Sequence, residues 1–221
     1  MSFSKEWEER FKANTHMSIW PWSKLVSYVT RYALPDGPSF RVLELGCGAG
    51  ANIPFFQKLG VQYFSIDGSP TVVTSLWKKF PQLKDNIIVG DYTKSIPFPG
   101  KFDLVVDRAS LSHNTTSSIT NCLAMVKAKL KLGRKYIGID WFSTKHNDYQ
   151  RGLPDEDIYT RRGYTKGPFA YIGRVHFSSK THLEELFCEM EIEVMEHKTI
   201  VREIPADNTV IATWNLVTKR I

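Results

Sequence analysis

One short stretch constrains the fold of this chain more than any other. The residues 42–45, apolar except for Glu44, run directly into Gly46-Cys47-Gly48-Ala49-Gly50, and a helical pattern follows from Asn52. An apolar run that ends in glycines and continues as a helix predicts a buried strand, a tight loop and a helix. Because glycine lacks a Cβ atom, the main chain of such a loop can approach a ligand closely, and the helix presents free amides to it. The stretch therefore predicts a site for a nucleotide-like cofactor.

Two kinds of cofactor loop fit these residues. Gly46-x-Gly48-x-x-Ala51 satisfies the dinucleotide-binding pattern that allows alanine in third place. Glu44-x-Gly46-x-Gly48-x-Gly50 resembles the first motif of class I S-adenosylmethionine-dependent methyltransferases, in which the loop wraps the methionine end of the cofactor. The loop alone does not separate a dehydrogenase-like protein from a methyltransferase, so other segments must decide.

Two acidic residues at later strand ends favour the methyltransferase. Asp67 closes the apolar run 63–66, about 20 residues beyond the first glycine, where both kinds of protein place an acid that accepts hydrogen bonds from ribose. Asp91 follows the next apolar run, 87–89, and resembles the methyltransferase residue that faces the adenine amino group. The second acid is the one that a dinucleotide site does not require.

The order of the remaining segments predicts the fold class. Further strands are expected at 102–107 and 135–140, a helix at 178–190, and a hairpin over 191–218. Together with the resemblance to methyltransferases, this order implies an α/β fold with a doubly wound, Rossmann-like sheet of seven strands, mostly parallel with an antiparallel last strand, and helices on both faces. A single methyltransferase domain should span 1–221, made of an N-terminal helical cap (1–38), a cofactor-binding core (39–140), an insertion or substrate lid (141–177), and a C-terminal helix and hairpin (178–221).

The resemblance implies S-adenosylmethionine as the cofactor and S-adenosylhomocysteine as the product. In the cap, Trp20-Pro21-Trp22 is expected to cover the ligand, although tryptophans at this spacing also serve in plain packing. The residues implied to bind the cofactor lie in the cap, the loop and the strand ends: Trp20, Glu44, Gly46, Cys47, Gly48, Gly50, Asn52, Asp67, Gly68, Asp91, Tyr92 and Asp107.

The loop after the fourth strand, 107–114, is where this family commonly places side chains that face the acceptor. His113 is the leading candidate for a base, because an imidazole titrates near neutrality; packing against the cofactor is the alternative. Asp107 could hold acceptor hydroxyls or cap the loop, and Arg108 could bind a carboxylate or phosphate. No His/Asp/Glu cluster has metal-ligand spacing, so we predict no metal.

The long segment 141–175 mixes basic and aromatic side chains and is the expected specificity element. Such a mixture suits an anionic, ring-containing acceptor, and a surface loop is the alternative. Together with one tryptophan of the cap, the residues expected to bind substrate are Trp22, Tyr159, Arg161, Arg162, Tyr164 and Arg174.

Composition narrows the partners. The net charge of +6 suits a small anionic substrate, while the chain has no dense Lys/Arg tract and no Asn/Asp-Pro-Pro-Tyr-like motif, which makes nucleic acid an unlikely partner. No apolar run approaches the roughly 20 residues of a membrane span, so we expect a cytoplasmic protein that does not enter a membrane. The sequence leaves the oligomeric state open.

These observations predict a methyltransferase that acts on oxygen or nitrogen of a small anionic metabolite. Residues 7–8 and 20–23, Trp-Glu and Trp-Pro-Trp-Ser, are similar to the start of small methyltransferases of bacterial surface-glycan assembly. That similarity makes a nucleotide-linked or sialic-acid-like sugar the best specific prediction. The alternatives are an RNA or protein methyltransferase, and a cofactor-sensing protein without turnover.

Overall fold

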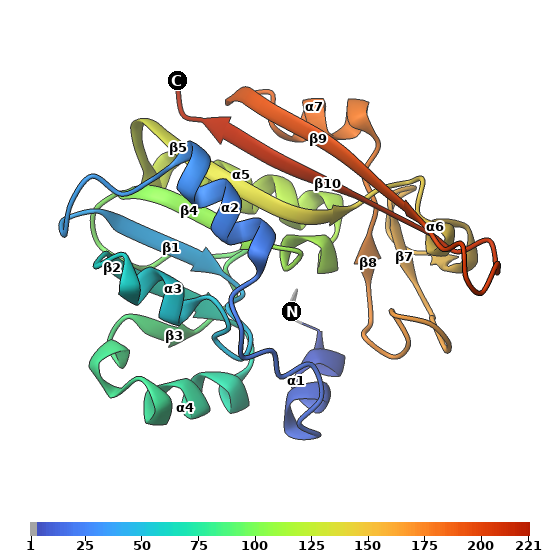
Figure 1. Cartoon of the computed structure of the whole chain (residues 1–221), viewed down its shortest axis with the longest axis horizontal. Coiled ribbons are helices and arrows are strands. Elements are labelled where there is room, and N and C mark those ends of the chain that lie inside the picture. Colours follow the sequence, from blue (N-terminus) through green and yellow to red (C-terminus); the bar gives the residue numbers. More distant parts are fainter. Residues whose placement is uncertain (1–3) are drawn as a thin grey trace.

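A seven-stranded sheet forms the centre of the molecule, in the order β3-β2-β1-β4-β5-β10-β9 (Figure 1). The structure is a computed structural model that describes residues 4–221. The strands are β1 (Arg41–Leu45), β2 (Gln62–Asp67), β3 (Ile87–Val89), β4 (Phe102–Arg108), β5 (Leu130–Phe142), β9 (Glu191–Val201) and β10 (Val210–Lys219). Strands β1 to β5 pair in parallel, and the last strand, β10, runs antiparallel to both β5 and β9. The predicted α/β fold is confirmed.

Helices cover both faces of the sheet because its strands are apolar on both sides. On β4, Leu104 and Val106 pack into one core and Val105 into the other, as the period of two in a strand requires. The core around Leu104 and Val106 includes side chains of α2 (Ser23–Tyr32), α3 (Ile53–Lys58) and α4 (Pro70–Lys79). The core around Val105 includes side chains of α5 (Thr116–Lys129) and α7 (Lys180–Leu186). Short 3-10 turns lie at Pro81–Leu83 (η1) and Leu111–His113 (η2).

The strand order sets the place where a ligand can bind. After β1 the chain builds outward through β2 and β3, and it then returns to the other side of β1 for β4 and β5. The connections that leave the carboxyl ends of β1 and β4 therefore diverge. In open α/β sheets ligands bind in the crevice at such a switch point.

The N-terminal cap is only partly helical. Helix α1 (Lys5–Lys12) and helix α2 are present, but residues 13–22 between them are irregular, and α2 begins at Ser23. Asn14 and His16 in this connection adopt left-handed backbone angles, with φ of 54° and 62°. Asn and His tolerate this region better than most residues.

The insertion is a folded unit. Strand β5 continues to Phe142 because it keeps pairing with β10, where Phe142 lies opposite Thr213. Beyond it lie α6 (Asn147–Arg151) and a small antiparallel sheet of β6 (Leu153–Pro154), β7 (Thr160–Arg162) and β8 (Val175–His176). This sheet and α6 pack on an apolar cluster of their own, formed by Tyr164, Phe169, Ile172, Val175 and Phe177.

None of the helices in the described part of the chain, residues 4–221, is both long enough and apolar enough to cross a bilayer.

Candidate active site

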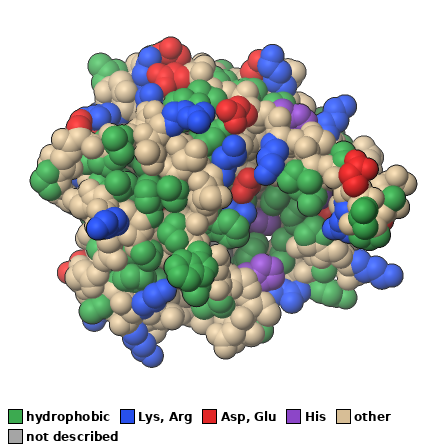
Figure 2. Space-filling model, in the orientation of Figure 1, with side chains coloured by type: hydrophobic (Ala, Val, Ile, Leu, Met, Phe, Trp, Pro, Cys, Tyr) green, Lys and Arg blue, Asp and Glu red, His purple; other side chains and the backbone are tan. Residues whose placement is uncertain are grey.

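A cavity of about 650 Å³ opens at the carboxyl ends of β1, β2 and β4. Its size lies within the range of about 300 to 1,000 Å³ that small-molecule sites occupy. Figure 2 shows the molecule hollowed on this face, with hydrophobic side chains inside the hollow and histidine at its edge. Of the predicted site residues, those that line the cavity are Trp22, Glu44, Gly46, Cys47, Gly48, Asn52, Asp67, Gly68, Tyr92, Arg108 and His113.

The glycine loop fits its surroundings only without side chains at two positions. Gly46 has φ of 69°, and a Cβ atom there would lie 2.5 Å from the Cβ of Ser110. Gly50 has φ of 77°, and a Cβ atom there would lie 2.5 Å from Leu76 of α4. Gly46 thus allows the loops after β1 and β4 to meet under the cavity. Gly50, which was predicted to touch the cofactor, instead makes room for α4 and does not line the cavity.

Asp67 at the end of β2 is held by main-chain amides. Its Oδ2 accepts a hydrogen bond from the amide of Gly48 at 2.8 Å, and its Oδ1 accepts one from Ser69 at 2.9 Å. Burial raises the pKa of this carboxyl, and the two amides oppose that effect. Each carboxylate oxygen can accept a second hydrogen bond, so Asp67 keeps capacity for a ligand in the cavity.

Glu44 supports the loop from inside the protein. Its oxygens accept hydrogen bonds from the Asn52 amide at 2.7 Å and from the Tyr63 hydroxyl at 2.6 Å. Burial raises the pKa of Glu44 to about 7. The other end of Asn52 accepts a hydrogen bond from the main-chain amide of Trp22 at 3.1 Å. Glu44 and Asn52 therefore join the glycine loop to the segment that precedes α2.

Asp107 shapes the loop after β4. Its carboxylate is fully buried and accepts hydrogen bonds from the amides of Ser110 and Leu111, at 2.9 and 3.1 Å, and from the Trp141 indole at 2.7 Å. Burial raises its pKa. Asp107 is absent from the cavity wall formed by residues 4–221. The sequence offered three roles for Asp107: binding the cofactor, holding an acceptor and capping the loop. These contacts match the loop cap.

His113 lies in η2 and has a defined tautomer. Its Nδ1 lies 3.0 Å from the carbonyl oxygen of Arg174, and because a carbonyl only accepts, Nδ1 carries the proton. Burial lowers the pKa of His113 to about 4, so the ring is neutral at pH 7. Nε2 is then the basic nitrogen. The Trp7 ring contacts this imidazole edge to face, with 4.9 Å between ring centroids.

Arg108 at the end of β4 is fixed on two sides. Its Nε and Nη2 lie 3.1 and 3.0 Å from Oδ2 of Asp140, and its guanidinium stacks 3.6 Å from the centre of the Trp22 ring. Asp140 adopts φ of 58° where the pairing of β5 with β10 is irregular, between Gly138 and Trp141. The arrangement holds a planar cation in the cavity wall with Nη1 outside the contact with Asp140.

The other predicted site residues are exposed to solvent or make contacts within the protein. Trp20 is 77% exposed, so of the neighbouring tryptophans Trp20 and Trp22 only Trp22 lines the cavity. The Asp91 carboxylate accepts hydrogen bonds from the amide and hydroxyl of Thr93. The five predicted residues of the insertion contact the small sheet and its surroundings instead of the cavity. The Tyr159 ring stacks on His182, and the Arg161 guanidinium lies over the Tyr149 ring. Arg162 pairs with Asp155, Arg174 pairs with Glu156, and the Tyr164 hydroxyl donates to the carbonyl of Asp148.

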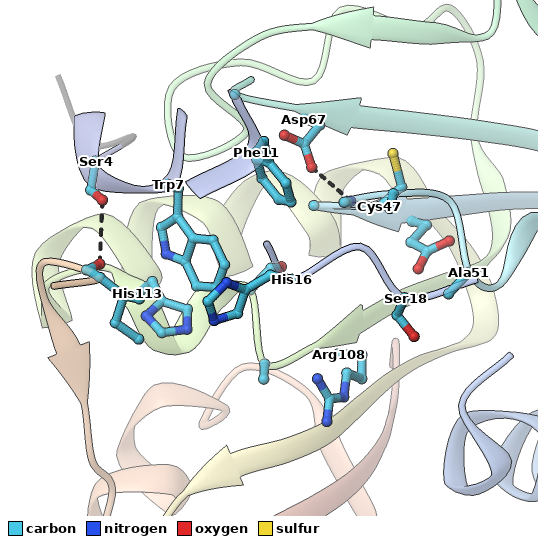
Figure 3. Close-up of a pocket in the computed structure, with 18 of the residues that line it drawn as sticks. Ser4, Trp7, Phe11, His16, Ser18, Cys47, Ala51, Asp67, Arg108 and His113 are labelled. Carbon is cyan, nitrogen blue, oxygen red and sulfur yellow. Dashed lines mark hydrogen bonds between the residues drawn. The ribbon is translucent and has the colours of Figure 1, made fainter. Parts of the chain in front are cut away.

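Aromatic residues that the sequence did not predict form the outer half of the cavity. Trp7 and Phe11 come from α1, Phe142 from the end of β5 and Phe169 from the insertion. Figure 3 shows Trp7, His16 and His113 gathered on one side of the cavity, with Asp67 and Cys47 on the other. The apolar face of α1 was visible in the sequence, but only the fold places it over the cavity. His16 carried no sequence signal apart from being a histidine.

Comparison with known proteins gives the class that this fold and site define. The chain superposes on a SAM-dependent methyltransferase from Methanosarcina mazei with a TM-score of 0.68 and 16% identity, covering 91% of this chain and 99% of the other. It superposes on geranyl diphosphate C-methyltransferase from Streptomyces coelicolor with a TM-score of 0.63 and 12% identity, covering 90% and 77%. The fold is that of S-adenosylmethionine-dependent methyltransferases.

Sequence comparison places the similarity in the core. Residues 42–133 match the family described as "Methyltransferase domain". A 71-residue stretch is 30% identical to 18S rRNA (guanine-N(7))-methyltransferase of Mus musculus, which is 32% of this chain and 25% of that protein. The chain thus spans about a quarter of the length of this curated relative. The match covers strands β1 to β4 and the helices between them, and the segments that build the outer half of the cavity lie outside it.

Proposed function

We propose that the protein is an S-adenosylmethionine-dependent methyltransferase that acts on oxygen or nitrogen of a small anionic metabolite. One observation carries the proposal: a single cavity brings the glycine loop and Asp67 together with His113 and Arg108. The first two meet the needs of an adenosyl cofactor, and the other two can serve an acceptor. The fold and the family match support the same class.

The inner half of the cavity would hold the cofactor. The carboxylate of Asp67 would accept hydrogen bonds from the ribose hydroxyls, and the loop from Gly46 to Gly48 would lie along the amino-acid end. S-adenosylmethionine supplies a methyl group that its sulfonium already activates. The main tasks of the chain are therefore to align the acceptor and to exclude water, and the aromatic outer half suits both.

His113 would remove the acceptor's proton. Its Nδ1–H is occupied by the carbonyl of Arg174, which fixes the ring and leaves Nε2 as the base. A pKa of about 4 keeps this nitrogen unprotonated at neutral pH. The low pKa also makes it a weak base, which suits an acceptor whose proton becomes acidic as the methyl group arrives.

Arg108 would bind the negative charge of the acceptor. Asp140 occupies Nε and Nη2, so Nη1 is the group with which a carboxylate or phosphate could interact, beside the ring of Trp22. A nucleotide-linked or sialic-acid-like sugar of glycan biosynthesis fits this requirement and stays our best specific prediction. The positive net charge of the chain supports an anionic acceptor.

RNA is the second candidate acceptor, because the mouse relative is named as an rRNA methyltransferase. Helix α1 argues for the smaller acceptor, since Trp7 and Phe11 cover the cavity and the carboxylate of Glu8 ties the helix to Thr71 of α4 at 2.6 Å. A nucleobase within an RNA chain would have to pass this helix to reach the cavity.

A turnover screen separates the acceptors. S-adenosylhomocysteine release would be followed with S-adenosylmethionine and each of three acceptors: a uridine diphosphate sugar, a cytidine monophosphate-linked sialic acid, and a short guanine-containing RNA. We expect turnover with one of the sugars and its loss in Arg108→Gln, with Arg31→Gln on the outer side of α2 as a control. Turnover with RNA alone would contradict the small-acceptor proposal and support the second candidate.

A further inference from the structure

A second imidazole belongs to the same cavity as His113. His16 lies in the connection between α1 and α2, is exposed to solvent, and lines the cavity. Its ring meets Trp7 edge to face, with 5.3 Å between centroids, while His113 meets the same indole at 4.9 Å. The two histidines therefore flank one tryptophan, as Figure 3 shows.

The hydrogen bonds of His16 define its tautomer. The hydroxyl of Thr15 donates to the carbonyl of Arg10 at 2.9 Å, which uses its only hydrogen. The same hydroxyl oxygen lies 3.1 Å from Nδ1 of His16, so it must accept a hydrogen bond from Nδ1–H. Nε2 of His16 is then the basic nitrogen, as in His113. Burial and the charge of Arg10 lower the pKa of His16, which favours the neutral ring at pH 7.

The backbone of His16 adopts a left-handed angle, with φ of 62°, which most side-chain-bearing residues avoid and which His tolerates better than most. Non-glycine residues in such regions concentrate at functional sites. The interactions that hold the segment come from both sides of the cavity, because Arg10 also donates to the carbonyl of Ala170 in the insertion at 2.9 Å.

We propose that His16 is a second proton acceptor of the site, which works with His113 on an acceptor group that carries at least two polar hydrogens. A primary amine or an amidine is the class that supplies two hydrogens on nitrogen. This inference rests on the proposed function and narrows it from oxygen or nitrogen to nitrogen. A hydroxyl group offers one hydrogen and would leave one of the two imidazoles without a partner.

The proton balance follows from the two basic nitrogens. Nε2 of the exposed His16 would take one proton from the protonated amine or amidine and pass it to water, which frees the nitrogen lone pair. That lone pair would attack the methyl carbon, so that a nitrogen–carbon bond forms and the sulfur–carbon bond breaks to leave neutral S-adenosylhomocysteine. The nitrogen becomes cationic as the methyl group arrives, and it would give its next proton to Nε2 of His113.

A binding experiment with two matched probes tests the proposal. The protein saturated with S-adenosylhomocysteine would be titrated calorimetrically at pH 7.5 with 4-(aminomethyl)benzoate and with 4-(hydroxymethyl)benzoate. Both probes carry a carboxylate for Arg108 and a flat ring for the aromatic wall, and they differ only in the group that the imidazoles would bind. We expect the amine to bind about fivefold to tenfold more tightly, the scale of one additional hydrogen bond.

Variants assign that preference to the imidazoles. His16→Asn removes the base but tolerates the left-handed backbone, so it should abolish the preference for the amine while S-adenosylhomocysteine still binds. His113→Gln should do the same. His197→Asn, in β9 and outside the cavity wall, is the matched control and should keep the preference.

The outcomes separate the inference from the proposed function. If S-adenosylhomocysteine does not bind, the proposed function fails and the inference fails with it. If it binds but the amine has no advantage, or His16→Asn keeps the advantage, only the role of His16 is overturned. Should His16→Asn not fold, nitrogen-15 spectra of the wild-type imidazoles decide: we expect a proton on Nδ1 of His16, and a proton on Nε2 instead would overturn the proposal.

Discussion

The two halves of the cavity are built in different ways. The inner half consists of glycines, main-chain amides and the buried carboxylates Glu44 and Asp67, which come from adjacent parallel strands and their loops. The outer half consists of side chains from α1, the connection after it, β5 and the insertion, which lie far apart in the sequence. The inner half therefore depends on backbone geometry, and the outer half depends on docking of separate segments.

This difference predicts how each half responds to change. A substitution in the inner half meets main chain or closely packed atoms that cannot move away. A substitution in the outer half changes the chemistry of the wall with less effect on the fold.

The largest effect should follow Gly46→Ala. The new methyl group would meet Ser110 at 2.5 Å and would occupy a left-handed backbone position, so we expect a loss of about 2 to 4 kcal/mol in the free energy of unfolding. Gly60→Ala is the control, since φ there is also 69° but no atom lies within 4 Å of the added carbon. Urea unfolding of both variants measures the difference. Equal losses would mean that the loops do not meet as closely as described.

The next largest effect concerns chemistry in the outer half. His113→Gln should lower turnover about 100-fold or more, because it removes the base, while the affinity for S-adenosylhomocysteine stays unchanged. Steady-state kinetics with the acceptor found in the screen, together with calorimetry, measures both quantities. Unchanged turnover in His113→Gln would mean that His113 contributes packing and does not act as the base.

Asp67→Ala tests the inner half without a new clash. Removing the carboxylate should weaken binding of S-adenosylhomocysteine by about 1 to 3 kcal/mol, the scale for a lost hydrogen-bonding group in a closed site. Asp36→Ala, on the surface beside Arg134, is the control. If calorimetry gives the same affinity for Asp67→Ala and the wild type, Asp67 does not bind the ribose.

The smallest effect is a dependence of stability on pH. The folded state lowers the pKa of His113 from 6.5 to about 4, so the neutral ring contributes stability that is complete above pH 6.5 and is lost as the pH falls towards 4. Between pH 7 and pH 5 this loss should amount to about 1 to 2 kcal/mol. Urea unfolding at the two pH values would show a smaller change in His113→Gln than in the wild type; an equal change would contradict the shift.

The same contrast explains what could be predicted from the sequence. Strands ending in Glu44–Gly46, Asp67 and Asp107 were recognisable because apolar runs stop at glycine or at an acid, and parallel strands bring those ends to one edge. The wall of Trp7, Phe142 and Phe169 was not, because these residues meet only after α1 and the insertion dock over the sheet. The sequence predicts substrate contacts for the basic residues of the insertion, whereas the structure shows them in ion pairs and ring contacts around the small sheet. Such pairing leaves no mark in the sequence.

Every role proposed for the cavity depends on the identity of the cofactor. Calorimetric titration of the purified protein with S-adenosylmethionine, S-adenosylhomocysteine and NAD, in parallel, tests that identity most directly. We expect both adenosyl ligands to bind and NAD not to bind. Binding of NAD without either adenosyl ligand would mean that Gly46 to Ala51 form a dinucleotide site and not a site for S-adenosylmethionine.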